Sequence, residues 1–233
     1  MTNLFKKSQD LPDQYLDVET TGLNTFFCQL LRWFATGNDY IESDPSTYSE
    51  VACSMELSRL PEAEALVVNG VSLPSLVQEN SLWSGIQEII KYIDLNTPSI
   101  WHAHNASFDA SVISNTIYQN LASPNLYPFK CNGNILLDTL MLVRAIHAFD
   151  STCGLIIPKD PKGFPVFKLE ALCAANSIKI DAHKAKDDTL ALRELVNIIK
   201  QLSPNVYRNA LHCSVKKNAR QKLLDSPYLF AAI

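Results

Sequence analysis

The sequence DVETTG at residues 17–22 follows an apolar run near the N-terminus and places two carboxylates on one predicted strand. Asp17 and Glu19 are two positions apart, so both side chains of an extended chain point to the same face. Two acids buried on one face repel each other and lose hydration, and a divalent cation removes both penalties. Carboxylate oxygens suit Mg²⁺ or Mn²⁺. The alternative is a pair of solvated acids on an edge strand, and the rest of the chain decides between the two.

The composition is typical of a globular protein. The chain has 233 residues, of which 47% are hydrophobic and 19% are charged, enough for one large domain or one domain with an extension. No stretch is long and apolar enough to span a bilayer, and residues 1–8 lack the apolar core of a signal peptide. We therefore expect a cytoplasmic protein with no membrane partner.

Charge and cysteine content restrict the class of partner. The net charge of −4 argues against broad affinity for nucleic acid, but it does not exclude a nucleic-acid enzyme whose acidic metal ligands lower the sum. Basic residues gather in residues 208–222, where a solvated helix face explains them at least as well as a DNA contact does. None of the six cysteines forms a C-x-x-C pair, so reduced core thiols are expected rather than a zinc site.

Hydrophobic patterns predict strands first and then strands that alternate with helices. Strands are expected at residues 14–19, 26–35, 51–55 and 97–103, helices at 74–93, 107–121, 168–176 and 184–202, and a strand end followed by a helix at 135–149. A long irregular segment is expected at 150–167, and residues 203–233 read as helical. This order predicts an α/β fold with a mixed sheet.

A second motif, HNASFD at residues 104–109, follows a predicted strand and opens a helix. Asp109 falls in the first turn of that helix, where the helix dipole favours a carboxylate. If Ser107 caps the helix and Asp109 only supports the dipole, no metal is involved. This motif alone therefore leaves both interpretations open.

A third motif, HKAKDD at residues 183–188, opens the long predicted helix. His183 lies five residues before Asp188, so both side chains can face one cavity, and the small Ala185 would let another backbone approach. Taken separately, His183 fits a surface histidine and Asp188 fits an acid that supports the helix dipole.

Together and in this order, the motifs D-x-E-T-T-G, H-N-x-x-F-D and H-x-A-x-x-D resemble those of the DEDDh family of 3′–5′ exonucleases, which have an RNase H-like mixed sheet flanked by helices. The resemblance implies a two-metal phosphodiester hydrolysis with Mg²⁺, or Mn²⁺ as a substitute, and His183 as the general base. It assigns four carboxylates to the metal ions: Asp17, Glu19, Asp109 and Asp188. Asp187 is not assigned to the metal ions, because its spacing from His183 does not fit the third motif. The spacing of Asp188 from His183 fits the motif, and so does the position of Leu192 after it.

A narrower resemblance, over roughly residues 12–225, is to the catalytic domain of bacterial exonuclease I, which degrades single-stranded DNA from the 3′ end. It rests on FD at 108–109, IYQN at 117–120, LDTLMLVRA at 137–145, FKLEAL at 167–172 and the long segment before Phe167. It implies substrate contacts from five residues: Glu19, Leu23, His104, Asn105 and Lys168. Lys168 stands where the family has an arginine, which keeps the charge but loses the bidentate fork on phosphate.

Exonuclease I also continues into an SH3-like domain and a helical domain that help to clasp the strand. We therefore expect a catalytic domain at residues 1–203 and a helical C-terminal extension at residues 204–233, in either a truncated copy or a minimal enzyme. The implied partner is single-stranded DNA, joined by a single-stranded DNA-binding protein if a longer form carries the further domains. Two alternatives remain open: a DEDDh exoribonuclease or proofreading exonuclease, and a nucleic-acid-binding module without turnover.

Overall fold

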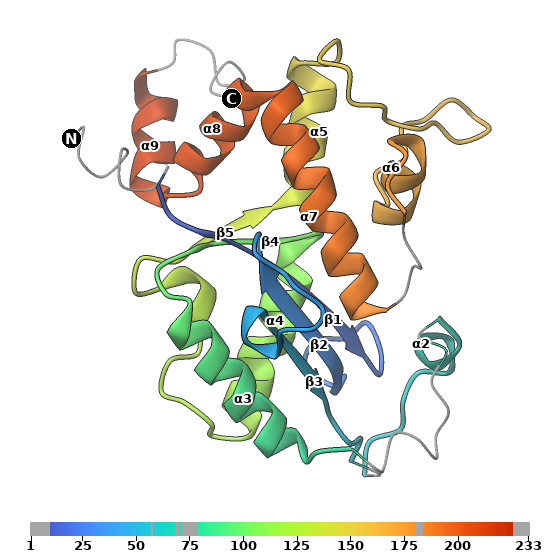
Figure 1. Cartoon of the computed structure of the whole chain (residues 1–233), viewed down its shortest axis with the longest axis vertical. Helices are drawn as coiled ribbons and strands as arrows, with labels where there is room; N and C mark the ends of the chain where they lie inside the picture. Colours follow the sequence, from blue (N-terminus) through green and yellow to red (C-terminus); the bar gives the residue numbers. More distant parts are fainter. Residues whose placement is uncertain (1–9, 57, 69, 71–78, 180–183, 226–233) are drawn as a thin grey trace.

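The computed structural model describes residues 10–56, 58–68, 70, 79–179 and 184–225. Five strands form one mixed sheet in the order β3-β2-β1-β4-β5 (Figure 1). Their bounds are β1 (Asp13–Thr20), β2 (Leu30–Gly37), β3 (Tyr48–Ala52), β4 (Ile100–Ala103) and β5 (Ile135–Asp138). β1 pairs antiparallel with β2 and parallel with β4, and β5 continues the parallel half. The predicted α/β fold with a mixed sheet is confirmed.

Helices cover both faces of this sheet. The α-helices are α2 (Ala63–Val68), α3 (Leu82–Leu95), α4 (Ala106–Gln119), α5 (Thr139–Phe149), α6 (Leu169–Ala175), α7 (Ala185–Leu202), α8 (Pro204–Cys213) and α9 (Lys216–Asp225). Short 3-10 turns lie at η1 (Pro45–Thr47) and η3 (Pro128–Lys130). Within the described ranges, no helix is long and apolar enough to cross a membrane.

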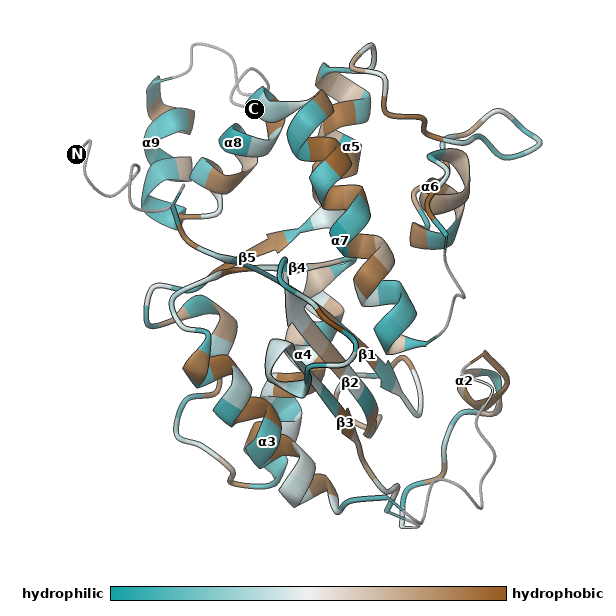
Figure 2. Cartoon of the chain, viewed as in Figure 1, coloured by the Kyte–Doolittle hydropathy of each residue, from teal (hydrophilic) through white to brown (hydrophobic). Residues whose placement is uncertain are grey.

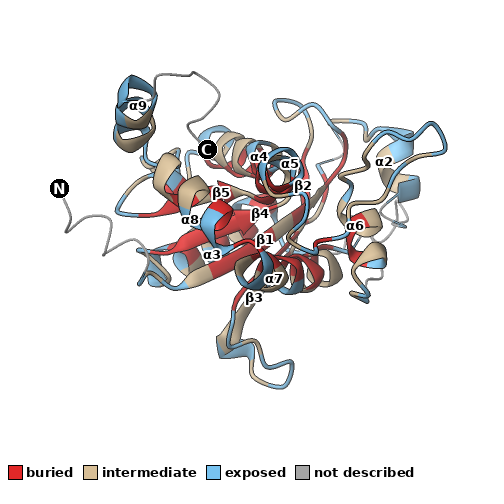
Figure 3. Cartoon of the chain, turned by 90° about the horizontal axis from the view of Figure 1, so that it is seen from above, coloured by how far each residue is buried: buried red, intermediate tan, exposed pale blue. Residues whose placement is uncertain are grey.

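The core consists of two main apolar layers, one on each face of the sheet. One layer joins α3 and α4 to the sheet, and the other joins α5, α7 and α8 to it. Buried residues are concentrated in the strands and on the inner faces of the helices (Figure 3). The long helix α7 follows this pattern, because Leu192, Leu195, Val196 and Ile199 recur at helical spacing and are all buried. This packing fixes α7 across β1 and β2 (Figure 1).

The second strand is shorter than the apolar run at residues 26–35 predicts. Residues 25–27 form a turn in which the amides of Phe27 and Cys28 donate to the carbonyl of Asn24 at 2.9 and 2.7 Å. Phe26 and Phe27 are 69% and 72% exposed, and β2 begins only at Leu30. Hydrophobicity alone did not distinguish a buried strand from exposed rings on a turn.

Three other boundaries also differ from the prediction. β3 covers Tyr48–Ala52 rather than residues 51–55. α3 begins at Leu82 rather than near Pro74, because the Ser81 side chain caps it by accepting from the amide of Ser84, and Pro74 itself lies outside the described residues. β4 begins at Ile100 rather than Thr97, after Pro98, which has no amide hydrogen for the ladder.

The C-terminal helices differ in how they contact the core. α8 buries Val206, Tyr207 and Leu211 in the same apolar layer as α5 and α7. α9 has no buried residues and is mainly hydrophilic (Figure 2). Ser203, at the predicted domain boundary, is buried between α7 and α8 and its hydroxyl donates to Asp150.

Candidate active site

Two of the predicted metal ligands come from β1. Leu16 and Val18 of this strand point into the layer beneath α3 and α4, whereas Tyr15 points into the layer that contains α7. Since side chains alternate along a strand, Asp17 and Glu19 lie on the same face as Tyr15. Both acids are therefore directed toward the side of the sheet that α7 covers.

The third acid comes from the first turn of α7. The amide of Asp188 donates to the carbonyl of Lys184 at 2.9 Å as the helix begins. The next residue, Thr189, is fully buried, and its hydroxyl donates to the carbonyl of Phe34 at 3.3 Å. Phe34 is the β2 partner of Asp17. The same point on β2 thus contacts both the strand that carries Asp17 and the helix that carries Asp188.

These elements bring three carboxylates together. Ligand oxygens of Asp17, Glu19 and Asp188 all lie within 4.8 Å of one another, so the three residues could hold a metal ion. The donor set is entirely carboxylate, which suits a hard divalent cation such as Mg²⁺ or Mn²⁺. Residues that are far apart in the sequence therefore form one acidic group between the central strand β1 and the start of α7.

Asp109 lies at the margin of this group. It is only 3% exposed, in the first turn of α4, and it accepts a hydrogen bond from the backbone of Val18. The residue at the N-cap of α4 is Asn105 and makes no side-chain cap bond. The alternative in which Ser107 caps this helix is therefore wrong, and Asp109 is more deeply buried than an acid that only supports a helix dipole would need to be.

Burial and mutual repulsion raise the pKa values of these acids. Burial raises the pKa of Asp17 well above its usual range, and the charges of the three other acids raise it further. Burial and the charge of Asp188 raise the pKa of Glu19 to about 7. Burial raises the pKa of Asp109 to about 8 and outweighs two backbone hydrogen bonds that lower it, and the charges of Asp138 and Glu19 add smaller increases. A bound divalent cation would stabilise the ionised forms, so the electrostatics of the site fit a metal ion.

The structure does not describe the predicted general base. His183 lies outside the described residues, which resume at Lys184 one position later. Its role remains a prediction from the third motif.

His104 and Asn105 occupy different environments in the second motif. The Nε2–H of His104 donates to the carbonyl of Phe167 at 2.8 Å, and burial lowers the pKa of this histidine. Asn105 is exposed and adopts the left-handed conformation, with φ 70°. Lys168, directly after Phe167, is exposed at the start of α6. His104 thus connects the second motif to the residue before Lys168.

A pocket of about 240 Å³ opens beside Glu19, and Leu23 and Phe108 contribute to its lining. Leu23 is 80% exposed, and its amide donates to Glu62 at 3.2 Å. Sequence reasoning missed Glu62, because no local pattern connects the residues before α2 to the first motif.

A second pocket, of about 280 Å³, lies between the turn at residues 25–27 and α4. Its lining includes the exposed residues Phe26 and Tyr127, serines of α4 and Lys130. Sequence reasoning missed this pocket too, since the prediction placed Phe26 in a buried strand.

The sequence is similar to several curated proteins that are named exodeoxyribonuclease I. The protein from Buchnera aphidicola (Schizaphis graminum strain) is 28% identical over 234 residues, which are 97% of this chain and 46% of that protein. The protein from Haemophilus influenzae is 31% identical over 178 residues, which are 75% of this chain and 37% of that protein. The chain therefore spans less than half the length of each of these two relatives. No protein-family model matches it.

Solved structures show the same fold. Escherichia coli exonuclease I in complex with a dT13 oligonucleotide matches 91% of this chain and 46% of its own, with a TM-score of 0.82 and 21% identity. Exonuclease I from Methylocaldum szegediense matches 93% of this chain and 46% of its own, with a TM-score of 0.82 and 22% identity. The expected mixed sheet flanked by helices is therefore confirmed as the fold that this chain shares with these neighbours.

Proposed function

We propose that this chain, a homologue of exodeoxyribonuclease I over most of its length, is a metal-dependent 3′–5′ exonuclease that hydrolyses single-stranded DNA to 5′-mononucleotides. The observation that carries the proposal is the convergence of Asp17, Glu19 and Asp188 within 4.8 Å. A non-catalytic binding module would gain nothing from burying mutually repelling acids, because isolated buried charges destabilise a fold. The names of the relatives support the same reaction.

Two Mg²⁺ ions, replaceable by Mn²⁺, are the proposed cofactors. Asp17, Glu19 and Asp188 would hold one ion, and Asp17 would share the second with Asp109. When bound, such ions lower the pKa of an attacking water and stabilise the leaving 3′ oxygen. The raised pKa values of Asp17, Glu19 and Asp109 mean that metal binding must release protons.

The remaining chemistry falls to protein side chains. His183 would take the proton of the attacking water, since an imidazole titrates near neutral pH. Lys168 would contact a phosphate with a single charged head rather than a guanidinium fork. The pocket beside Glu19 and Leu23 would receive the terminal nucleotide, with His104 and Asn105 next to it.

The preference for DNA rests on the relatives, one of which was solved with an oligonucleotide. The pocket at Phe26 and Tyr127 supports a single-stranded substrate, because exposed rings stack on unpaired bases of any sequence.

Residues 1–203 would form the catalytic domain and residues 204–233 the start of an extension. A single-stranded DNA-binding protein would be a partner only of a longer form with further domains. A DEDDh exoribonuclease is the second candidate, because sugar choice depends on contacts with the 2′-hydroxyl.

Digestion of end-labelled single strands tests the proposal. DNA and RNA of the same sequence, labelled at either end, are incubated with Mg²⁺, Mn²⁺ or EDTA. We expect mononucleotide release from the 3′ end of DNA, dependent on the metal and absent in Asp17→Ala and Asp188→Ala. Release from the 5′ end, or undiminished activity in EDTA, would contradict the assignment, and faster digestion of RNA would select the second candidate.

A further inference from the structure

The geometry points to Asp138 as a positioning residue whose carboxylate holds the turn that carries Asp109 to the metal-binding acids. This inference rests on the proposed function and deepens it, because Asp138 would act through Asp109 and not as a ligand. Asp138 is the last residue of β5. It is not one of the four acids that the resemblance assigns to the metal ions, and it is not part of the three-carboxylate group.

Asp138 lies where two parallel strands end side by side. β4 and β5 pair in parallel, with Ala103 opposite Asp138, and each strand leads into a helix. The Oδ1 atom of Asp138 accepts from the amide of Leu140 at 3.0 Å and from the amide of Asn105 at 3.1 Å. A single carboxylate oxygen therefore connects the first turn of α5 to the residue that precedes α4.

The turn before α4 needs such an anchor. Asn105 is the N-cap of α4, but it adopts φ 70° and ψ 47° and makes no side-chain cap bond. The left-handed conformation is unfavourable for a residue with a Cβ, although asparagine tolerates it better than most. The bond from the Asn105 amide to Asp138 is an interaction across the sheet that holds this conformation.

Asp109 depends on this turn for its position. It lies four residues after Asn105, in the first turn of α4, with its side chain almost completely buried. A rotation of the turn would move the start of α4, and with it the Asp109 carboxylate relative to Asp17. Side chains that orient metal ligands in this way typically contribute ~10–100-fold to metal affinity or activity.

Helix capping alone does not explain both contacts. The bond to Leu140 is an ordinary N-cap of α5, comparable with the bond from the Ser84 amide to Ser81 at the start of α3. The bond to Asn105 is additional and joins a different helix. Ser81→Ala is therefore a matched control, because it removes a helix cap but leaves the active-site turn unchanged.

The experiment compares Asp138→Ala, Asp138→Asn, Asp138→Ser and Ser81→Ala in the full chain. Asparagine keeps an oxygen acceptor at the same distance, whereas serine keeps a cap for α5 on a side chain that is too short to reach Asn105. Calorimetric Mn²⁺ titration, kcat and KM on single-stranded DNA, and thermal unfolding are measured for each. If Asp138→Ala does not fold, Asp138→Ser provides the test.

We expect Asp138→Ala and Asp138→Ser to weaken Mn²⁺ binding and lower kcat by ~10-fold or more, with KM little changed. Asp138→Asn should keep Mn²⁺ affinity and kcat near the wild-type values. Ser81→Ala should lower thermal stability without changing Mn²⁺ affinity or kcat. Wild-type Mn²⁺ affinity and kcat in Asp138→Ser would overturn the inference. If the wild-type chain has no nuclease activity, the Mn²⁺ titrations still decide the role of Asp138, so the two failures are distinguishable.

Discussion

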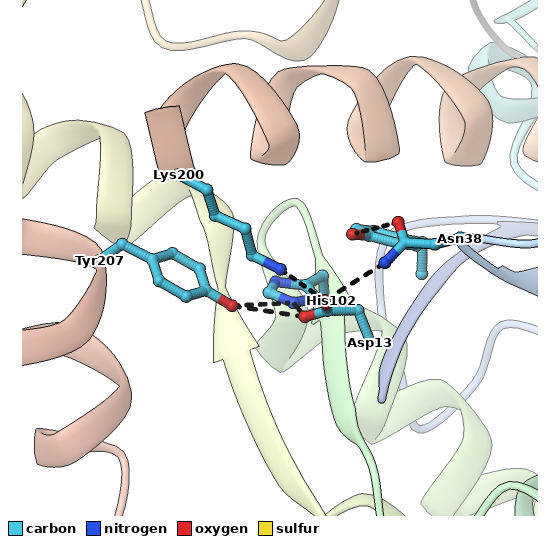
Figure 4. Close-up of polar contacts among 6 residues, drawn as sticks. Asp13, Asn38, His102, Lys200 and Tyr207 are labelled. Carbon is cyan, nitrogen blue, oxygen red and sulfur yellow. Dashed lines mark hydrogen bonds and ion pairs between the residues drawn. The ribbon is translucent and has the colours of Figure 1, made fainter. Parts of the chain in front are cut away.

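Asp13 at the start of β1 accepts a hydrogen bond from the Nε2–H of His102 on β4 at 2.8 Å, at the opposite end of the strand from the acidic group (Figure 4). Lys200 of α7 pairs with the same carboxylate, and the hydroxyl of Tyr207 on α8 lies 3.4 Å from it. His102 is fully buried. The network thus joins β1 and β4 to α7 and α8, which pack on them.

This network predicts a loss of stability in acid. Burial alone would raise the pKa of Asp13, but the contacts with His102 and Lys200 outweigh it and lower the pKa to about 2 from 3.8. The ionised carboxylate stabilises the fold above pH 3.8, and this contribution is lost as the pH falls toward 2. The shift corresponds to on the order of 2 kcal/mol. Urea unfolding between pH 6 and pH 2 should therefore give a smaller difference between wild type and Asp13→Asn at the acid end; a constant difference would contradict this.

The acids of the candidate active site predict the opposite slope for the metal-free protein. The folded pKa of Glu19 is about 7 and that of Asp109 about 8, both above their unfolded values. The folded state keeps protons that the unfolded state has released, so the free energy of unfolding falls as the pH rises from about 5 to about 8. Denaturant titrations in EDTA should show this fall, and Asp109→Asn should make it shallower. Saturating Mn²⁺ should remove it, because metal affinity increases as the ligands lose protons.

The prediction is wrong if, in EDTA, the free energy of unfolding has the same pH dependence in wild type and Asp109→Asn between about pH 5 and about pH 8. The acids would then be better solvated than the structure indicates.

The sequence predicts the parts of this site that depend on local pattern. Asp17 and Glu19 share a face because they are two positions apart on a strand, and Asp188 falls in the first turn of its helix. The sequence did not predict the turn that exposes Phe26, because an apolar run does not reveal which backbone amides pair. It also did not predict the bond from Asn105 to Asp138, which exists only because β4 and β5 are neighbours in the sheet.

Asp187 and Asp188 allow a direct test of the assignment on α7. Both are in the first turn, but only Asp188 contributes to the three-carboxylate group. Asp188→Asn should abolish turnover and weaken Mn²⁺ binding, because it removes a ligand charge. Asp187→Asn removes the same charge from the neighbouring position and should leave both nearly unchanged. Calorimetric Mn²⁺ titration decides, and equal losses in the two variants would mean that the effect is general electrostatics.

His183 is predicted to act on the proton and not on the metal. His183→Ala should slow turnover by ~10²–10⁴, the usual contribution of a general base, while Mn²⁺ affinity is largely kept. Single-turnover rates and Mn²⁺ titrations on the same preparation separate the two effects. If His183→Ala loses metal as completely as Asp17→Ala does, the histidine is a ligand and the assignment is wrong.

The final prediction concerns how firmly the chain holds its substrate. Lys168 offers one ammonium group, exposed at the start of α6, where an arginine would offer a bidentate fork. The net charge of −4 provides no long-range attraction for DNA. We therefore expect frequent release, with a ladder of partly shortened products under excess substrate.

Lys168→Arg should lower KM for single-stranded DNA and leave the rate of the chemical step nearly unchanged. Lys91→Arg, a substitution of an exposed lysine on α3, makes the same chemical change on another helix and should alter neither. Digestion of long strands in the presence of trap DNA measures how many nucleotides are removed per encounter. Complete degradation in one encounter would mean that other residues, such as the basic segment at 208–222, already enclose the strand.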